Sequence, residues 1–349
     1  MDTSIRSHSR SIYNSNGSNR DPKYEDPNSC SHQIITIIYP FYKLFTSEGS
    51  RSDIAKGLFF VIFLGVFTSL FAPKSADLSV PYRSISAAIG YSYFFAWSVS
   101  FYPQVFLNMK RRSTMGLNPD YALYNVVGFA FYSIFNCSFF FSSSIRDDYA
   151  NRHNGEQNPV RSNDVLFAVH AFVLSVIGLA QIYKFDGFAK QKVSKFCLLA
   201  NGFMGFAAFL YAFLIFFLGS PEVVDESSYL TWLDFTYVLS YMKMVITLIK
   251  YLPQVRSNFQ RQSTSGWNIW NVILDFTGGT LSTAQLLLDC LDMNDFSGIY
   301  GDIVKFGLGC VSIIFDIIFM VQHYILYSHN SYDDDDDDDD LLERKSLSV

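Results

Sequence analysis

The chain has 349 residues, of which 50% are hydrophobic, 17% aromatic and 17% charged. Its 35 phenylalanines and 22 tyrosines far exceed the aromatic content of an ordinary soluble domain, which favours a protein solvated by lipid. The formal net charge of −6 includes the eight aspartates 333–340, so the rest of the chain is nearly neutral and offers no excess charge for a nucleic acid partner. The five cysteines are scattered, so we expect no disulfide framework, no metal site and no other cofactor.

A polar N-terminal region precedes a short apolar segment. Residues 1–56 are expected to be disordered and cytosolic, or to be removed by processing, because residues 1–33 are too polar to bury a core. Residues 57–72 are uninterruptedly apolar or small and would make a helix about 24 Å long. This segment is predicted to be a signal anchor or an internal cleavable signal, and both interpretations place residue 73 outside the cytosol.

Seven longer apolar segments follow this first one. They are predicted to span the membrane as helices, with bounds near 84–106, 119–141, 164–184, 196–218, 231–253, 266–289 and 302–326. The connections after the first, third and fifth segments contain eight Lys or Arg residues, whereas the second, fourth and sixth contain three. The basic connections are therefore expected in the cytosol, together with the acidic tail 327–349.

The sequence contains an internal repeat. A shift of 150 residues aligns residues 101–118 with 251–268 without a gap, and ten of the 26 positions from the first proline onward are identical. Two copies that start four spans apart have the same orientation in a membrane. The matched dipeptides are Pro103-Gln104 and Pro253-Gln254.

This repeat predicts the architecture. We expect an all-α integral membrane protein with a seven-helix 3+1+3 core, in which two parallel triple-helix bundles, 84–184 and 231–326, are joined by a linker helix at 196–218. A proline inside a helix removes one backbone hydrogen bond and clashes with the preceding turn. Pro103 and Pro253, each followed by a glutamine, are therefore candidate hinges, and simple structural kinks remain the alternative.

Polar side chains at membrane depth suggest a central site. Lys243 and Lys250 are seven residues apart, so they lie on one face of a helix and could bind two anionic groups about 10 Å apart. Asn271 and Asp275 share a face of the sixth span, and the repeat places Asn125 of the second span at the position of Asp275. Polar groups of both copies are therefore expected to converge on one cavity.

Two further acids occur in the spans. Asp316 lies in the middle of the last span, and Asp164 begins the third. Charges in hydrocarbon are costly and usually face a cavity, a partner or water. Lys250 and Asp164 lie near segment ends, however, where they could instead reach the interface or cap a helix. An ion pair between Lys243 and Asp275 would likewise satisfy both groups without any transport role.

Five stretches resemble the cystinosin family of PQ-loop proteins: WSVSFYPQV (97–105), NPVRSNDVLF (158–167), YMKMVITLIKYLPQ (241–254), NVILDFTGG (271–279) and KFGLGCVSIIFDIIFMVQH (305–323). The resemblance covers about residues 84–327 and includes the polar positions between the Pro-Gln dipeptides. It implies a lysosomal exporter that moves L-cystine and protons to the cytosol across the bilayer. It also implies the 3+1+3 fold, with the start of the first helix outside the cytosol.

The resemblance also implies roles for individual residues. The implied proton-coupling acids are Asp164 and Asp275, with Asp316 as a third. The implied substrate cavity comprises Asn125, Lys243, Lys250, Tyr251, Asn258, Asn271 and Asp275, with Trp97 and Phe101 as its walls.

The sequence departs from the family in two places. Animal members carry a long glycosylated domain before the first helix, whereas only residues 73–83 would be lumenal here. The family's tyrosine-based tail signal is absent, and Asp337-xxx-Leu341-Leu342 instead resembles an acidic dileucine signal for clathrin-adaptor proteins. A solvated low-complexity tail is the alternative interpretation of this acidic region.

The chemistry of cystine agrees with this set of residues. Cystine carries two carboxylates and two ammonium groups, which call for paired cations, an anion and amides in one cavity. An acidic lumen would protonate a carboxyl group that burial has made less acidic, and a neutral cytosol would remove the proton. Because the substrate has no net charge, one accompanying proton would make transport electrogenic.

Three other functions fit the sequence less well. Among other PQ-loop exporters, one for cationic amino acids should not prefer a site with two lysines, and one for sugars would not need two lysines and an aspartate at mid-depth. A heptahelical receptor would need an extracellular disulfide and a DRY or NPxxY-like motif, neither of which the sequence contains. An enzyme is not expected, because no nucleophile and base pair or metal-ligand cluster is found at a membrane face.

Overall fold

The computed structural model describes residues 39–47, 49–74, 78–152, 155, 160, 162–218, 230–294 and 303–328. The chain divides into two units, Met1–Phe41 and Tyr42–Val349, and all that follows concerns the second. Of the region 1–56 that was predicted to be disordered, residues 1–38 and 48 lie outside the described residues, whereas 39–45 and 51–56 are helical. The sorting residues Asp337, Leu341 and Leu342 also lie outside the described residues.

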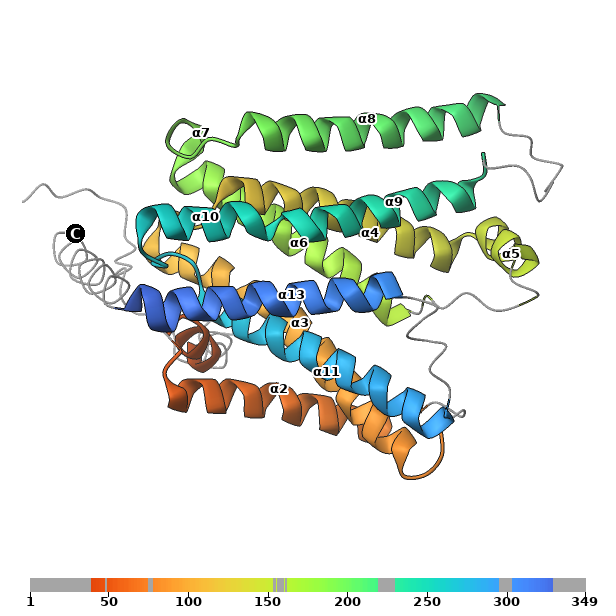
Figure 1. Ribbon diagram of the computed structural model, residues 1–349, viewed down its shortest axis with the longest axis horizontal. Helices are drawn as coiled ribbons and strands as arrows, with labels where there is room; N and C mark the ends of the chain where they lie inside the picture. Colours follow the sequence, from red (N-terminus) through yellow and green to blue (C-terminus); the bar gives the residue numbers. More distant parts are fainter. Residues whose placement is uncertain are drawn as a thin grey trace, which may run out of the picture. The chain divides into compact units, whose positions relative to one another are not determined.

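The described chain is helical throughout (Figure 1). Its helices are α2 (Arg51–Phe71), α3 (Tyr82–Arg111), α4 (Pro119–Phe141), α5 (Ser143–Arg152), α6 (Ser162–Phe185), α7 (Gly187–Lys190), α8 (Lys195–Leu218), α9 (Trp232–Ile249), α10 (Tyr251–Arg261), α11 (Ile269–Met293), α13 (Ile303–Val321) and the π-helix η1 (Gln322–Leu326). Within the described ranges, six helical segments are long and apolar enough to cross a membrane, counting α9 and α10 as one. The predicted all-α membrane fold is confirmed.

Two long helices fall outside that group of six. α3 has 30 residues and α11 has 25, so both are long enough, but they are more polar than the others. They pack extensively against each other, and α3 buries Ser86, Ser92 and Ser100 along its length. The greater polarity of α3 and α11 is therefore explained by their position in the interior of the bundle.

The segment predicted to be a signal anchor or a cleavable signal lies in α2, which packs on the bundle. α2 begins at Arg51, six residues before the predicted apolar segment, because the side chain of Ser50 caps it by accepting a hydrogen bond from the Asp53 amide. Gly57 lies against the ring of Trp270, and Gly65 lies against the backbone of Ser92 on α3. The opposite face carries a ladder of exposed phenylalanines at positions 59, 63, 67 and 71.

The remaining helices form two groups of three. α3 and α4 both pack on α6, and α11 and α9 both pack on α13, with α10 continuing from α9. The two groups meet where α3 contacts α11 and where α4 contacts α9, while α8 covers α4 and α9 from outside (Figure 1). This is the packing expected of two triple-helix repeats with one connecting helix.

The two prolines have different local effects. Pro103 lies inside the continuous helix α3, whereas the helix breaks at Lys250 before Pro253 and resumes as α10. Both helices continue beyond the predicted ends at 106 and 253, and both stop at a residue with positive φ, Arg112 and Gln262. A proline removes one backbone hydrogen bond from the helix but does not prevent the next turn from forming.

Candidate functional site

The two repeats are joined by a reciprocal contact of their glutamines. The side-chain amide of Gln104 donates to the carbonyl of Gly266 at 3.0 Å and accepts from the backbone N–H of Asn268 at 2.8 Å. Gln254 makes the same pair of contacts with the other loop, donating to Gly116 at 2.8 Å and accepting from Asn118 N–H at 2.7 Å. Each glutamine therefore holds the loop of the other repeat.

A second layer of amides holds the glutamines. Gln104 donates to Asn108, which donates to Gln181 on α6 at 2.8 Å. In the other repeat Gln254 donates to Asn258, which donates to Gln322 at 3.1 Å. All of these amides are buried. Asn258 was predicted to line the substrate cavity, and its side-chain hydrogen bonds instead belong to this network.

The two loops also touch through their backbones. Gly116 and Gly266 both have positive φ, 113° and 79°. A Cβ atom on Gly116 would meet the backbone of Ser265 and Gly266, and one on Gly266 would meet the backbone of Met115. Only glycine fits at either position. The loops and amides together join the two repeats at this end of the bundle.

Each loop has one further anchor at the third helix of its own repeat. Thr114 donates to the carboxylate of Asp186 at 2.6 Å from its hydroxyl and at 2.5 Å from its backbone N–H. Partial burial opposes the charged form of Asp186, but these hydrogen bonds outweigh it and hold its pKa below the usual value. In the second loop, the hydroxyl of Thr264 is 2.8 Å from Nδ1 of His323.

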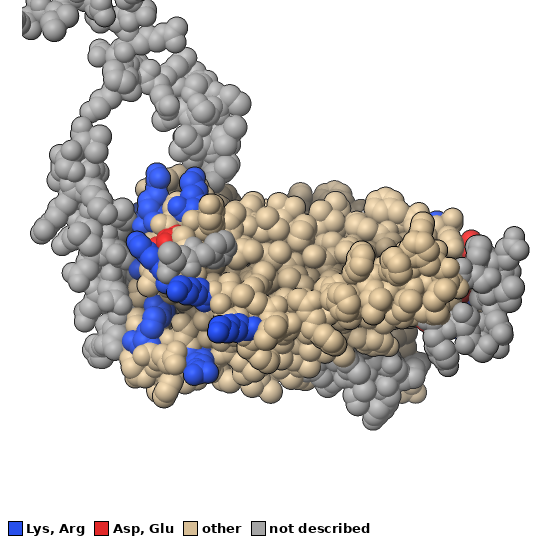
Figure 2. All heavy atoms as spheres, turned by 90° about the horizontal axis from the view of Figure 1, so that it is seen from above, with Lys and Arg blue, Asp and Glu red and all other residues tan. Residues whose placement is uncertain are grey.

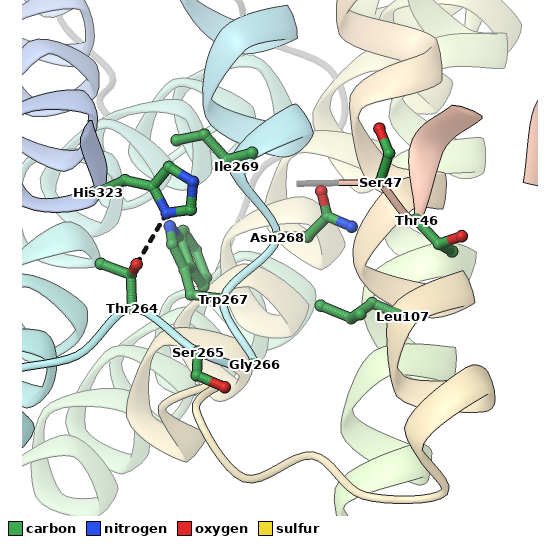
Figure 3. Close-up of a pocket in the computed structure, with 10 residues that line it drawn as sticks. All are labelled: Thr46, Ser47, Leu107, Thr264, Ser265, Gly266, Trp267, Asn268, Ile269 and His323. Carbon is green, nitrogen blue, oxygen red and sulfur yellow. Dashed lines mark hydrogen bonds between the residues drawn. The ribbon is translucent and has the colours of Figure 1, made fainter. Parts of the chain in front are cut away.

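A cavity of about 40 Å³ lies beside the second loop. Figure 3 shows His323 beside Thr264 and Trp267 on one side, and Ser47 and Asn268 toward the other. The carbonyl of Phe45 accepts a hydrogen bond from the Asn268 side chain, so the segment before α2 packs against this loop.

The central polar site lies between α4 and α9. The ammonium groups of Lys243 and Lys250 are each 5.8 Å from the ring centroid of Phe129, a distance at which a cation is attracted by an aromatic face. Lys243 is also 5.2 Å from the ring of Tyr132, and Lys250 is 4.6 Å from the ring of Tyr251. The two predicted cations therefore share one aromatic cage.

A carboxylate on α11 lies next to this cage. The hydroxyl of Tyr251 donates to Asp275 at 2.9 Å and is 3.0 Å from the hydroxyl of Ser312. Lys250 and Asp275 interact electrostatically, but within the described residues no ion pair joins Asp275 to either lysine. The alternative ion pair of Lys243 with Asp275 is therefore not formed in this structure.

Amides complete the site. Lys250 donates to the side-chain carbonyl of Asn125 at 3.2 Å. Tyr121 lies near Asn125 and Asn271, and its ring centroid is 6.2 Å from that of Tyr251. The repeat predicted that polar groups of α4 and α11 would converge. Lys250 contacts Asn125 of α4, and the adjacent Tyr251 contacts Asp275 of α11.

The third predicted acid is buried nearby. Asp316 is 1% exposed, one helical turn beyond Ser312, and its Oδ2 atom has no hydrogen-bond partner among the described residues. It interacts electrostatically with Asp275 and Lys250. A buried carboxyl oxygen without a hydrogen-bond partner is costly.

The other predicted residues are more peripheral. Trp97 packs against Gly278, where a Cβ atom would meet the indole ring. Phe101 lies edge-on to Phe129 at 5.2 Å, so it borders the aromatic cage. Asp164 lies in the first turn of α6, at the opposite end from the loops, and acts electrostatically on Tyr132.

The centre is closed in this structure. The cavity lined by Asn125, Phe129, Lys243 and Lys250 has a volume of only about 10 Å³, room for about one water molecule. A ligand larger than a water molecule would fit here only if the surrounding helices moved apart.

Some residues of the site were not predicted. Tyr121 could have been found, because the shift of 150 residues places it opposite Asn271. Gln181 and Gln322 could not be matched in this way, because they are 141 residues apart. The third helices of the two repeats are thus not related by the shift of 150 residues, so an ungapped alignment does not match these two equivalent amides.

A family model described as "PQ loop repeat" matches residues 85–145 and 235–295. "Cystinosin" of Drosophila melanogaster is 43% identical over 265 residues, which are 76% of this chain and 63% of that protein. "Cystinosin homolog" of Dictyostelium discoideum is 42% identical over 70% of this chain and 81% of that protein. "Cystine transporter" of Saccharomyces cerevisiae is 26% identical over 69% of this chain and 94% of that protein. The chain spans about 60% of the fly protein and of two nematode relatives.

Proposed function

The chain belongs to the cystinosin family, and from this premise we propose that it exports L-cystine from the lysosome lumen to the cytosol together with protons. The observation that carries the proposal is the central site. Two ammonium groups, a carboxylate and two amides lie there, around or beside one closed cavity.

The chemistry of the site fits a double zwitterion. The carboxylates of cystine would take the places near Lys243 and Lys250, which lie on one face of α9 and its C-terminal cap. An ammonium group would pair with Asp275, and the amides of Asn125 and Asn271 would satisfy the remaining donors and acceptors. A neutral sugar would leave the charges unpaired, which is costly in a buried site.

Proton coupling is assigned to the acids that border the site. Asp275 and Asp316 interact electrostatically with each other, so a proton on one of them eases the burial of both. Asp164, at the opposite end of the bundle from the loops, would take up the proton from the lumen. Protonation on the acidic side and release on the neutral side would give transport its direction.

Alternating access follows from the packing. The two triple-helix groups meet along α3 with α11 and along α4 with α9, and the glutamine contacts seal the end that carries the two loops. We assign that end to the cytosol because of its basic connections. Rocking of one group against the other about Pro103 and Pro253 would break these contacts and open the site.

Location is part of the proposal. We assign the protein to the lysosomal membrane with a cytosolic C-terminus, where Asp337, Leu341 and Leu342 form the proposed sorting signal for clathrin-adaptor proteins.

Substrate identity is tested by counterflow in proteoliposomes at equal pH on both sides. Vesicles loaded with unlabelled cystine are expected to accumulate labelled cystine, and external lysine or glucose is expected not to compete. Competition by lysine, or counterflow that lysine supports and cystine does not, would replace the proposed substrate by a cationic amino acid.

A further inference from the structure

We propose that the aspartate run 333–340 docks on a basic surface at the end of the bundle that carries the two loops. This surface, here called the basic collar, consists of exposed side chains on several helix ends. Its members are Arg112, Lys184, Lys190, Lys192, Lys195 and Arg256.

The collar surrounds the end at which the chain leaves the bundle. Arg112 is the C-cap of α3, Lys184 lies in the last turn of α6, and Arg256 lies on α10. Figure 2 shows Lys and Arg side chains gathered at one end, with tan surface over most of the remaining length. α13 and η1 end at the same end of the bundle (Figure 1), so the tail starts beside the collar.

The acids at this end are already engaged. Asp186 is hydrogen-bonded to Thr114, and Asp120 accepts the backbone N–H of Ser194 at 2.7 Å. The ion pairs of the described residues join Asp53 to Lys56 and Arg152 to its two acidic partners. No collar residue forms an ion pair within the described part of the chain, so the collar's charge is available to a partner.

The aspartate run can reach the whole collar. The first aspartate lies seven positions after Leu326, a reach of up to about 25 Å, and the run itself adds roughly as much. Neighbouring helices lie about 8–10 Å apart, so the helix ends that carry the collar fall within this range. The tether also keeps the run at a local concentration on the order of millimolar.

Many weak pairs acting together make the contact. One exposed ion pair contributes only about 0–1 kcal/mol, but eight carboxylates facing six cations act as one multivalent ligand. Such a contact is screened by salt, because the Debye length falls from about 10 Å at 0.1 M to about 3 Å at 1 M. Docking would tie the end of α13 to the connection between α6 and α8.

The test places a photo-crosslinking amino acid at position 336 of the full-length protein in neutral phosphatidylcholine nanodiscs, with crosslinked peptides identified by mass spectrometry. We expect crosslinks to the connection that contains Lys190, Lys192 and Lys195. They are expected to fall at least about fivefold at 1 M salt, where the charges are screened. The matched control keeps the label and changes the other seven aspartates to Asn, which preserves length and removes charge.

Charge reversal provides the second arm. Lys190→Glu, Lys192→Glu and Lys195→Glu together are expected to abolish the crosslinks, and Asp→Lys changes in the tail are expected to restore them. Equal crosslinking by the Asn tail would overturn the proposal, as would failure of the reversed pair to restore it. Loss of the crosslinks when phosphatidylserine is added would assign the collar to anionic lipid instead. None of these readouts depends on transport.

Discussion

At the scale of single residues, the central site separates charges that a simple buried ion pair would bring together. Lys250 is held by Asn125 and Asp275 by Tyr251, so each charge is satisfied by a neutral group. Two opposite charges kept apart in this way are available to a ligand that carries both signs, which is the property that the proposed substrate requires.

Asp275→Asn tests the carboxylate. The amide has nearly the same shape and can still accept the Tyr251 hydroxyl, but it neither pairs with an ammonium group nor carries a titrating proton. We expect acid-driven uptake of labelled cystine to fall at least about tenfold, a loss of roughly 1.4 kcal/mol. Uptake with unchanged pH dependence would remove Asp275 from the mechanism.

Tyr251→Phe tests the hydroxyl that holds this carboxylate. The change leaves the ring against the ammonium group of Lys250 and removes the hydrogen bonds to Asp275 and Ser312. A hydrogen bond to a charged group contributes about 1.5–3 kcal/mol, so we expect a lower melting temperature. Tyr241→Phe, at a 60% exposed position of α9, is the control. Equal melting temperatures for the two variants would contradict the assigned contact.

At the scale of elements, the exchange of glutamines makes the two loops a single structural unit. Gln104 belongs to one repeat and completes the loop of the other, and Gln254 does the reverse. A hinge at the prolines would therefore not act alone, because any opening at this end must break both glutamine contacts together.

Gly116→Ala and Gly266→Ala test the contact of the two loop backbones. Each alanine would have a strained positive φ and a methyl group against the backbone of the other loop, which costs on the order of 2 kcal/mol or more. We expect lower melting temperatures and less monodisperse protein in detergent. Gly202→Ala on α8 has no atom within 4 Å of its new methyl and serves as control; loop variants as stable as this control would refute the close approach.

Asp186→Asn tests the anchor of the first loop through pH. The folded state lowers the pKa of Asp186 below its unfolded value of about 3.9, so its stabilisation is complete above that pH and is lost as pH falls through the folded pKa. We expect the variant to be less stable than the parent at pH 7 and the difference to shrink below about pH 4. A difference that stays constant with pH would assign the effect to shape rather than to charge.

At the scale of the whole molecule, the sequence predicted most of what depends on composition and periodicity. The spans, the repeat and the position of Lys243 and Lys250 on one helix face all follow from the spacing of apolar and charged residues. Contacts between helices were harder to predict, because the spacing of residues along one helix does not determine which other helix it contacts. Asn258 illustrates this: its type suits a binding cavity, but its helix turns it toward Gln322.

The helix before the core shows the same limit. The apolar sequence of residues 57–72 predicted a helix. Its packing against α3 through Gly65 could not be predicted, because it depends on the shape of a surface formed by residues elsewhere in the sequence. The glutamine exchange between repeats could also not be predicted, because the Pro-Gln match shows that the two positions are equivalent but not that each glutamine contacts the other repeat.

Replacement of Leu341 and Leu342 by Ala tests the proposed sorting signal. A dileucine signal needs both apolar side chains, so we expect the tagged protein to move from endolysosomes to the cell surface. The tail keeps its charge in this variant, which makes surface biotinylation a direct readout. An unchanged endolysosomal distribution would show that the acidic tail does not sort the protein through these residues.

The central claim is tested most directly by recording cystine uptake and membrane current together in cells that carry the Leu341→Ala and Leu342→Ala protein at their surface. The exterior is held at about pH 5.5 or about pH 7.4, so that it stands in for the lumen or for neutral conditions. We expect saturable cystine uptake that is stimulated by acid and accompanied by inward current, both lost in Asp275→Asn. Surface protein that takes up no cystine at either pH, or takes it up without current or pH dependence, would contradict the account.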